Sequence, residues 1–211
     1  MKITKLVHSC LLIEDGGKIA IIDPGQWSAQ SGLLNLDFLT RIDYILVTHA
    51  HIDHCDPLFI ESIRDHSPES LIISNQTVID ELAKHGIHGA VSGPSEIHMA
   101  TTTHAVFQSG QEATENTIIT LWNKLTHMGD SLHLVRPAPI LALPITAPWG
   151  SLGMALDVAV QMQPQYVIPI HDWHLSDEGK VWYYQKAEEI LAPKGIKFMP
   201  LSDGNTIEIN V

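Results

Sequence analysis

His49-Ala50-His51-Ile52-Asp53-His54 places four potential metal ligands within six residues. This stretch directly follows Tyr44-Ile45-Leu46-Val47, a short apolar run that is typical of a buried strand. Asp56-Pro57 then offers a helix N-cap and a proline for the first helical position, which predicts a helix to about Arg64. The histidines are therefore expected in a loop that joins a buried strand to a helix.

The spacing within this loop suits two metal ions. Side chains of an extended segment alternate between its two sides, so His49 and His51 can converge on one ion while Asp53 and His54 reach a second. Imidazole and carboxylate ligands suit Zn²⁺, with Mn²⁺ or Fe²⁺ as alternatives, and they require no thiolate. The competing interpretation is a polar surface loop that happens to be rich in histidine. The strand before the loop and the capped helix after it favour a metal site.

The rest of the chain alternates predicted strands and helices in both halves. The first 25 residues predict a β-meander with a turn at Gly16-Gly17. Further strands are expected at 71–73, 97–103, 117–122, 125–128, 140–143, 166–170 and 206–211, and helices at 77–85, 152–162 and 178–191. Because no stretch reads as a domain linker and 211 residues suit one α/β sandwich, we expect residues 1–211 to form a single domain.

Composition narrows the classes of partner and compartment. The formal net charge is -12 with only 12 Lys and Arg, which argues against nucleic acid and leaves a small-molecule substrate, with a homo-oligomer possible. No apolar run approaches the roughly 18 residues of a membrane span, and the N-terminus lacks the features of a signal peptide, so we expect a soluble protein that is not exported. The two cysteines, Cys10 and Cys55, fit a reducing compartment, and we therefore predict a cytoplasmic location.

The run from His49 to His54 resembles the H-x-H-x-D-H signature of the metallo-β-lactamase superfamily. The opening segments His8-Ser9-Cys10-Leu11-Leu12-Ile13-Glu14 and Ile22-Asp23-Pro24-Gly25 are similar to its branch of small metal-dependent hydrolases that includes the ascorbate-6-phosphate lactonase-like proteins. The resemblance implies a fold of the α/β (α+β) class, a four-layer αββα sandwich. In that fold two β-sheets lie face to face, helices lie outside them and the metals lie at one edge.

The resemblance also implies three later ligands. His104 ends the strand-like stretch 100–103, as the third histidine of the family does, and His98 is its rival on the same strand face. Asp130 follows Gly129 in a turn that resembles the family's G-D-[ST] turn, whose aspartate bridges both metals. His171 follows the strand at 166–170 and matches the last ligand, with His174 as the rival and a candidate pocket residue.

Asp23 has two interpretations. It matches the aspartate of the family's first motif, which supports the histidine loop by hydrogen bonding. It is equally the first residue of an Asp-Pro-Gly turn, where aspartate is common for local reasons.

The ligand set implied by the resemblance divides between two ions. One metal would take His49, His51 and His104, the other Asp53, His54 and His171, and Asp130 would be shared. Such a set leaves room for a bridging water, whose pKa two ions can lower to about 7, so that hydroxide forms near neutral pH. This predicts hydrolysis of a small ester, lactone, phosphoester or amide, and the resemblance adds a proton-shuttling role for Asp53.

Two other classes of function use the same scaffold. Diiron redox members of the superfamily carry glutamate in place of the second histidine of the first motif, whereas this chain has His51. Non-catalytic binding proteins usually have eroded ligand sets, whereas all seven positions can be filled here. Both alternatives therefore rank below a hydrolase.

Overall fold

A computed structural model describes residues 1–39, 41–106 and 114–211. The chain forms two compact units: unit 1 comprises Met1–Ser95 and Ser202–Val211, and unit 2 comprises Glu96–Leu201. Each unit contains one six-stranded sheet with parallel and antiparallel pairs. The expectation of a single domain stays a prediction.

The sheet of unit 1 begins as the predicted meander. In the order β12-β1-β2-β3-β4-β5, its strands are β12 (Thr206–Glu208), β1 (Lys2–Lys5), β2 (Leu11–Asp15), β3 (Lys18–Ile22), β4 (Tyr44–Leu46) and β5 (Leu71–Ile73). Gly16 and Gly17, with φ of 57° and 79°, make the tight β2–β3 turn that other residues would strain. Because β3 and β4 are parallel, their carboxyl ends meet at one edge, which brings Asp23 next to the start of the histidine loop.

Short helices connect and cover the strands of unit 1. They are α1 (Gln26–Ser31), the 3-10 turn η1 (Leu36–Phe38), α2 (Pro57–His66) and α3 (Gln76–Ala83). The Asp56 side chain accepts hydrogen bonds from the backbone N–H groups of Leu58 and Phe59, so α2 begins where the sequence predicts. Helices α2 and α3 pack apolar residues such as Ile60 and Leu82 into the same core as strands β2 to β5.

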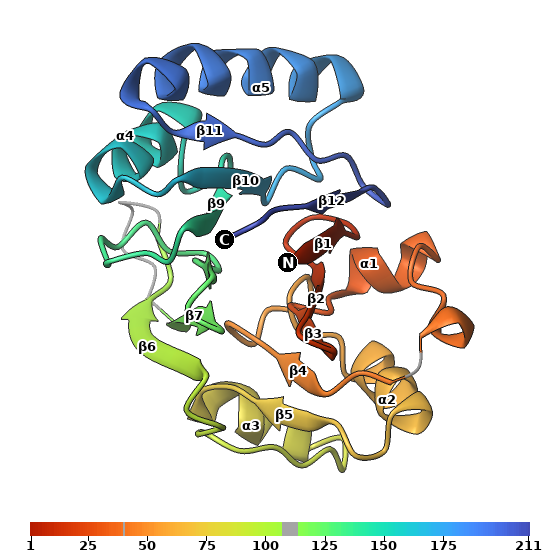
Figure 1. The fold of residues 1–211 in the computed structure, drawn as a ribbon. Helices are drawn as coiled ribbons and strands as arrows, with labels where there is room; N and C mark the ends of the chain where they lie inside the picture. The colour runs from red at the N-terminus through yellow and green to blue at the C-terminus, as the bar shows by residue number, and fades with distance from the viewer. Residues whose placement is uncertain (40, 107–113) are drawn as a thin grey trace. The chain divides into compact units, whose positions relative to one another are not determined.

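Unit 2 has the strand order β11-β10-β9-β8-β7-β6. Its strands are β6 (Ile97–Thr103), β7 (Glu115–Leu121), β8 (Leu125–His127), β9 (Ile140–Pro144), β10 (Tyr166–Ile170) and β11 (Lys197–Phe198). Its helices are α4 (Leu152–Met162), α5 (Asp177–Leu191) and the 3-10 turn η2 (Ala192–Lys194). Figure 1 shows α5 running alongside β11, and the apolar faces of α4 and α5 share a buried core with β9 and β10.

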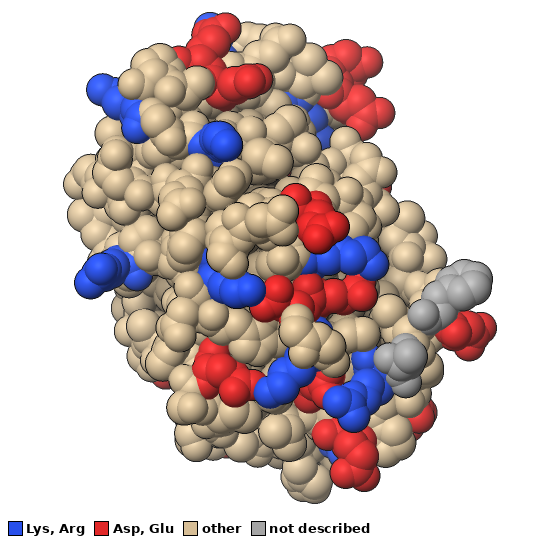
Figure 2. Space-filling view, viewed as in Figure 1, with Lys and Arg blue, Asp and Glu red and all other residues tan. Residues whose placement is uncertain are grey.

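The predicted elements of both units are present with small shifts of their ends, while α1 and β11 were not predicted. No helix among the described residues is both long enough and apolar enough to cross a membrane. On the face drawn in Figure 2, Lys and Arg side chains lie interspersed with acidic ones.

Candidate metal centre

The predicted histidine loop begins at His49, three residues after β4 ends at Leu46. His49 and His54 are fully buried, and His51 is exposed. The Nε2 atom of His49 lies 3.1 Å from Nδ1 of His51, so the two rings turn these nitrogens toward one point. The loop closes on itself, because the N–H groups of His54 and Cys55 both donate to the carbonyl oxygen of His51. The four residues predicted as ligands are thus held together within unit 1.

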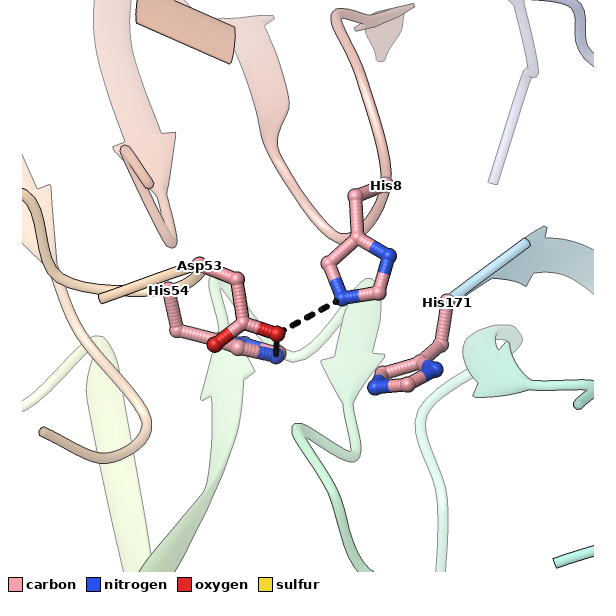
Figure 3. A group of neighbouring side chains, drawn as sticks. All are labelled: His8, Asp53, His54 and His171. Carbon is pink, nitrogen blue, oxygen red and sulfur yellow. Dashed lines mark ion pairs between the residues drawn. The ribbon is translucent and has the colours of Figure 1, made fainter. Parts of the chain in front are cut away.

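Asp53 lies between two imidazoles of the same unit. Its Oδ2 atom is 3.4 Å from Nε2 of His8 and 3.8 Å from Nε2 of His54, and Figure 3 draws both ion pairs as dashed lines. His8 is buried, and its ring packs edge-on against Trp27 and His54. In the sequence, His8 stood out only as the first residue of an opening segment that resembles the family, whereas the structure places it in direct contact with Asp53.

A fully buried carboxylate, Asp23, orients the histidine loop. Its Oδ1 accepts the backbone N–H of Thr48, and its Oδ2 accepts the Thr48 hydroxyl and Nδ1–H of His54, at 2.8, 2.8 and 2.7 Å. The Thr48 oxygen in turn lies 3.0 Å from Nδ1 of His49. Asp23 therefore fixes His54 directly and His49 through Thr48, which supports the interpretation of Asp23 as a residue that holds the loop.

The loop also rests against Gly25. A Cβ atom at this position would lie 1.7 Å from the carbonyl oxygen of Asp53, well inside any allowed contact. The N–H of Gln26 donates to the carbonyl of Ile52, and the N–H of Asp56 donates to that of Pro24. The segment Asp23-Pro24-Gly25 is therefore both a turn and the support on which the loop lies.

Three predicted ligands come together in unit 2. Oδ2 of the buried Asp130 lies 3.1 Å from Nε2 of His104 and 3.1 Å from Nε2 of His171. The Nδ1 atom of His171 faces the carbonyl oxygen of Thr146 at 2.8 Å, and Nδ1 of His104 faces the carbonyl oxygen of Ala105. The indole of Trp149 packs edge-on against both histidine rings.

The structure separates the rival histidines. His98 is an exposed residue of β6, whereas His104 is buried beside Asp130. His174 is exposed and its Nε2 lies 3.4 Å from the Thr146 hydroxyl, whereas His171 contacts Asp130. Partial desolvation, and after it the neighbouring His171, lowers the pKa of His174. These positions favour His104 and His171, although their assignment as ligands stays a prediction.

Three of these residues hold unusual backbone conformations. His8, Asp23 and His171 have φ of 64°, 53° and 61°, in the left-handed region that non-glycine residues rarely occupy. Each such residue costs on the order of 1–3 kcal/mol unless its surroundings compensate, and such strain tends to gather at functional sites. His8 and Asp23 direct buried polar side chains toward the histidine loop, and His171 directs one toward Asp130.

The donor set fits a divalent metal ion. His54, His104 and His171 each turn Nδ1 toward an oxygen acceptor and Nε2 toward a carboxylate. A neutral imidazole has one N–H, so Nδ1–H donates to its acceptor and the Nε2 lone pair is left for a metal. A cation between each Nε2 and its facing carboxylate satisfies both groups, and imidazole with carboxylate is a donor set that zinc, manganese and iron accept.

The cysteines lie outside this donor set. Cys10 and Cys55 are both buried and free of disulfides. Burial, and then the charge of Asp23, raises the pKa of Cys55 to about 12, so its thiol is neutral at physiological pH. Neither cysteine belongs to the groups of described side chains that could hold a metal ion, and both pack in the hydrophobic core of unit 1.

Sequence reasoning missed three residues that hold the predicted ligands. The Thr48 hydroxyl lies between the Asp23 carboxylate and Nδ1 of His49 and contacts both. The carbonyl of Thr146 faces Nδ1 of His171, and the Asn116 side chain accepts the backbone N–H of Asp130. Only Asn116 had a visible signal, since it is a strongly polar residue directly before the strand predicted at 117–122. Roles that depend on a backbone carbonyl leave no mark in the sequence.

Residues 2–171 match the family model described as a beta-lactamase superfamily domain. A relative from Mycobacterium tuberculosis, Protein Rv0786c, is 27% identical over 90% of this chain and 92% of its own length. A UPF0173 metal-dependent hydrolase of Flavobacterium johnsoniae is 39% identical over 42% of this chain and 38% of its own length.

The fold also matches a solved structure. Igni18, a metallo hydrolase from the archaeon Ignicoccus hospitalis, superposes with a TM-score of 0.71 at 23% identity, covering 99% of each chain. The predicted α+β fold of the metallo-β-lactamase type, built from two mixed sheets with helices, is thereby confirmed. Because the family model matches residues 2–171, which is most of the chain, the protein belongs to the beta-lactamase superfamily.

Proposed function

We propose that this protein is a metal-dependent hydrolase whose two clusters of ligands together bind two divalent metal ions, most favourably zinc. Oδ2 of Asp130, which lies 3.1 Å from a nitrogen of both His104 and His171, carries the proposal. A carboxylate oxygen that faces two imidazole nitrogens suits a ligand shared between two cations. The names of relatives as metal-dependent and metallo hydrolases support it.

The proposed ligands are those of the first motif together with the later residues. In this proposal one ion takes His49, His51 and His104, the other takes Asp53, His54 and His171, and Asp130 is shared. When bound, a metal pair supplies a water acidified to a pKa of about 7 and an electrophile that polarises the scissile group. The protein's own contribution is to hold the imidazoles in the required tautomers and orientations.

Asp53 is the residue that we propose moves a proton. Its half-buried carboxylate lies 3.4 Å from Nε2 of His8, an arrangement that fixes one carboxylate oxygen and leaves the side chain partly open to solvent. From that position Asp53 can pass a proton to the leaving group of a bound substrate.

The proposed substrate is a small ester, lactone, phosphoester or amide, in keeping with the resemblance to ascorbate-6-phosphate lactonase-like proteins. A net charge of -12 disfavours nucleic acid. We also propose a cytoplasmic location, because a chain with two cysteines suits a reducing compartment.

Elemental analysis of the purified full-length chain, followed by a screen of phosphodiester, lactone and ester substrates with the metal-loaded protein, tests the proposal. His51→Ala and Asp130→Ala should lose bound metal and hydrolysis while the far-ultraviolet circular dichroism is kept. His98→Ala, which changes an exposed histidine of β6, is the matched control and should retain both. Full hydrolysis by a metal-free preparation would overturn the proposal, and iron with O₂ or NO turnover in place of hydrolysis would favour a diiron redox protein.

A further inference from the structure

The turn that carries Asp130 is held by side chains as well as by the sheet. It follows β8 as Met128-Gly129-Asp130, and Gly129 has φ of 56°. The N–H of Gly129 donates to Nδ1 of His127 at 3.1 Å, and the carbonyl of Asp130 accepts the N–H of Ala105 at 2.8 Å. Two further backbone groups of the turn, the carbonyl of Met128 and the N–H of Asp130, form hydrogen bonds with a side chain of β7.

Asn116 satisfies both of these groups. Its Oδ1 accepts the N–H of Asp130 at 3.0 Å, and its Nδ2 donates to the carbonyl of Met128 at 3.0 Å. The side chain is completely buried within β7, where a polar group costs stability unless it is hydrogen-bonded. One amide therefore clamps the turn on both sides of Gly129.

The same amide reaches the strand that leads to His104. Nδ2 of Asn116 also donates to the hydroxyl of Thr102 at 3.2 Å, and that hydroxyl donates to the carbonyl of Asn116 at 3.1 Å. Thr102 lies opposite Asn116 in the β6–β7 register and two residues before His104. Asn116 is thus hydrogen-bonded to both segments that carry the His104–Asp130 pair.

From these contacts we infer that Asn116 is a positioning residue that sets the distance between His104 and Asp130 and thereby determines metal affinity. This inference rests on the proposed function, because it assumes that the pair binds metal. Partners that orient metal ligands typically change metal affinity by about 10–100-fold when they are removed.

Only an amide meets both hydrogen-bonding demands at this position. Aspartate has nearly the same shape and can accept the N–H of Asp130, but its second oxygen would face the carbonyl oxygen of Met128 without a proton between them. Alanine removes all three side-chain hydrogen bonds, those to Asp130, Met128 and Thr102, and leaves two buried backbone groups of the turn without this partner. The two substitutions therefore test the donor half of the clamp and the whole clamp.

The test measures Zn²⁺ dissociation constants by chelator competition on the full-length chain, for wild type, Asn116→Ala and Asn116→Asp. A second readout is the visible absorption spectrum after loading with Co²⁺, which reports ligand geometry. Thr120→Val is the matched control. Thr120 lies on β7 like Asn116, and its 3.0 Å side-chain hydrogen bond to Thr126 of β8 does not involve the Asp130 turn. Thermal unfolding of the metal-free chains measures the purely structural effect.

We expect both Asn116 variants to bind Zn²⁺ about 10–100-fold more weakly and to change the Co²⁺ spectrum, while Thr120→Val changes neither. Wild-type affinity in both Asn116 variants overturns this inference and leaves the proposed function standing. Absence of Zn²⁺ binding by the wild-type chain overturns both. If Asn116→Ala does not fold, the affinity of Asn116→Asp decides the question. If the metal-free Asn116→Asp chain is also unfolded, the inference fails, because Asn116 would then be needed for folding and not specifically for metal affinity.

Discussion

Nδ1 of His54 lies 2.7 Å from Oδ2 of Asp23, and both side chains are completely buried. A charged acceptor at this distance strengthens the hydrogen bond and keeps the ring proton on Nδ1. The Nε2 lone pair of His54 is thereby turned toward Asp53 and prepared for a metal ion. The orientation of a predicted ligand thus depends on a residue outside the ligand set.

Replacing Asp23 by asparagine tests this dependence. Asparagine keeps the shape and tolerates the φ of 53° at this position. Its amide N–H, however, can donate to Nδ1 of His54 and move the ring proton to Nε2, where it blocks coordination. We expect Asp23→Asn to weaken Zn²⁺ binding by about 10–100-fold in chelator competition. Asp43→Asn, which alters a carboxylate that accepts the N–H of Ile19 in the same unit, is the control, and equal affinities for the two variants would contradict this role.

Gly25→Ala should disrupt the histidine loop. Because the new Cβ would lie 1.7 Å from the carbonyl oxygen of Asp53, the loop or the turn must move. We expect a loss of at least about 3 kcal/mol in the free energy of unfolding, measured with denaturant, together with loss of metal binding. Gly153→Ala in α4 is the matched control, since its nearest contact would be 3.9 Å away and alanine favours a helix. A Gly25→Ala chain as stable as wild type would show that this close approach is not required.

The two histidines that follow β10 should differ in their effect on metal content. His171→Ala removes an imidazole that lies 3.1 Å from Asp130, so we expect elemental analysis to show less bound metal per chain. His174→Ala removes an exposed ring that lies 3.4 Å from the Thr146 hydroxyl and edge-on to His171 but is not among the proposed ligands, so its metal content should equal that of wild type. The reverse pattern would exchange the roles of the two residues.

Both cysteines should resist thiol reagents in the folded chain. Burial raises the pKa of Cys10 far above its ordinary value and that of Cys55 to about 12, so neither is a thiolate at pH 8. We expect labelling to be negligible at pH 8 and to reach two thiols per chain after denaturation.

The same shifts predict how stability depends on pH. The unfolded thiols lose protons above a pH of about 9 while the folded thiols remain neutral, so stability should fall as pH rises from 9 toward 12. A Cys55→Ala chain should lose part of this alkaline dependence when unfolding is followed by denaturant titration. Rapid labelling at pH 8 would contradict the raised pKa values.

The sequence predicted most of the fold because its signals are local. Short apolar runs mark β4 and β10, and the Asp56-Pro57 cap marks the start of α2. Helix α1 escaped prediction because its six residues, Gln26 to Ser31, are too few for a periodic pattern. Strand β11 escaped because two residues leave no alternation, and only pairing with β10 defines it.

The site was predictable where ligands are dense and less so where they are single. The segment from His49 to His54 is recognisable because it holds four potential ligands in six residues. His104 and Asp130 are separated by 25 residues, and only the family pattern pointed to them. Their contact depends on β6 and β8 each pairing with β7. The choice between His104 and His98 depends on burial, which a period of two residues along a strand cannot resolve.

The neutral, enclosed thiol of Cys55 sits one position after His54 and yet stays out of the donor set. Thiophilic ions such as cadmium and copper(I) owe their tight binding in proteins to sulfur. With only nitrogen and oxygen presented, the proposed centre offers these toxic ions little advantage over zinc. The enclosure of Cys55 in the core thus leaves such ions without a sulfur ligand at the proposed centre.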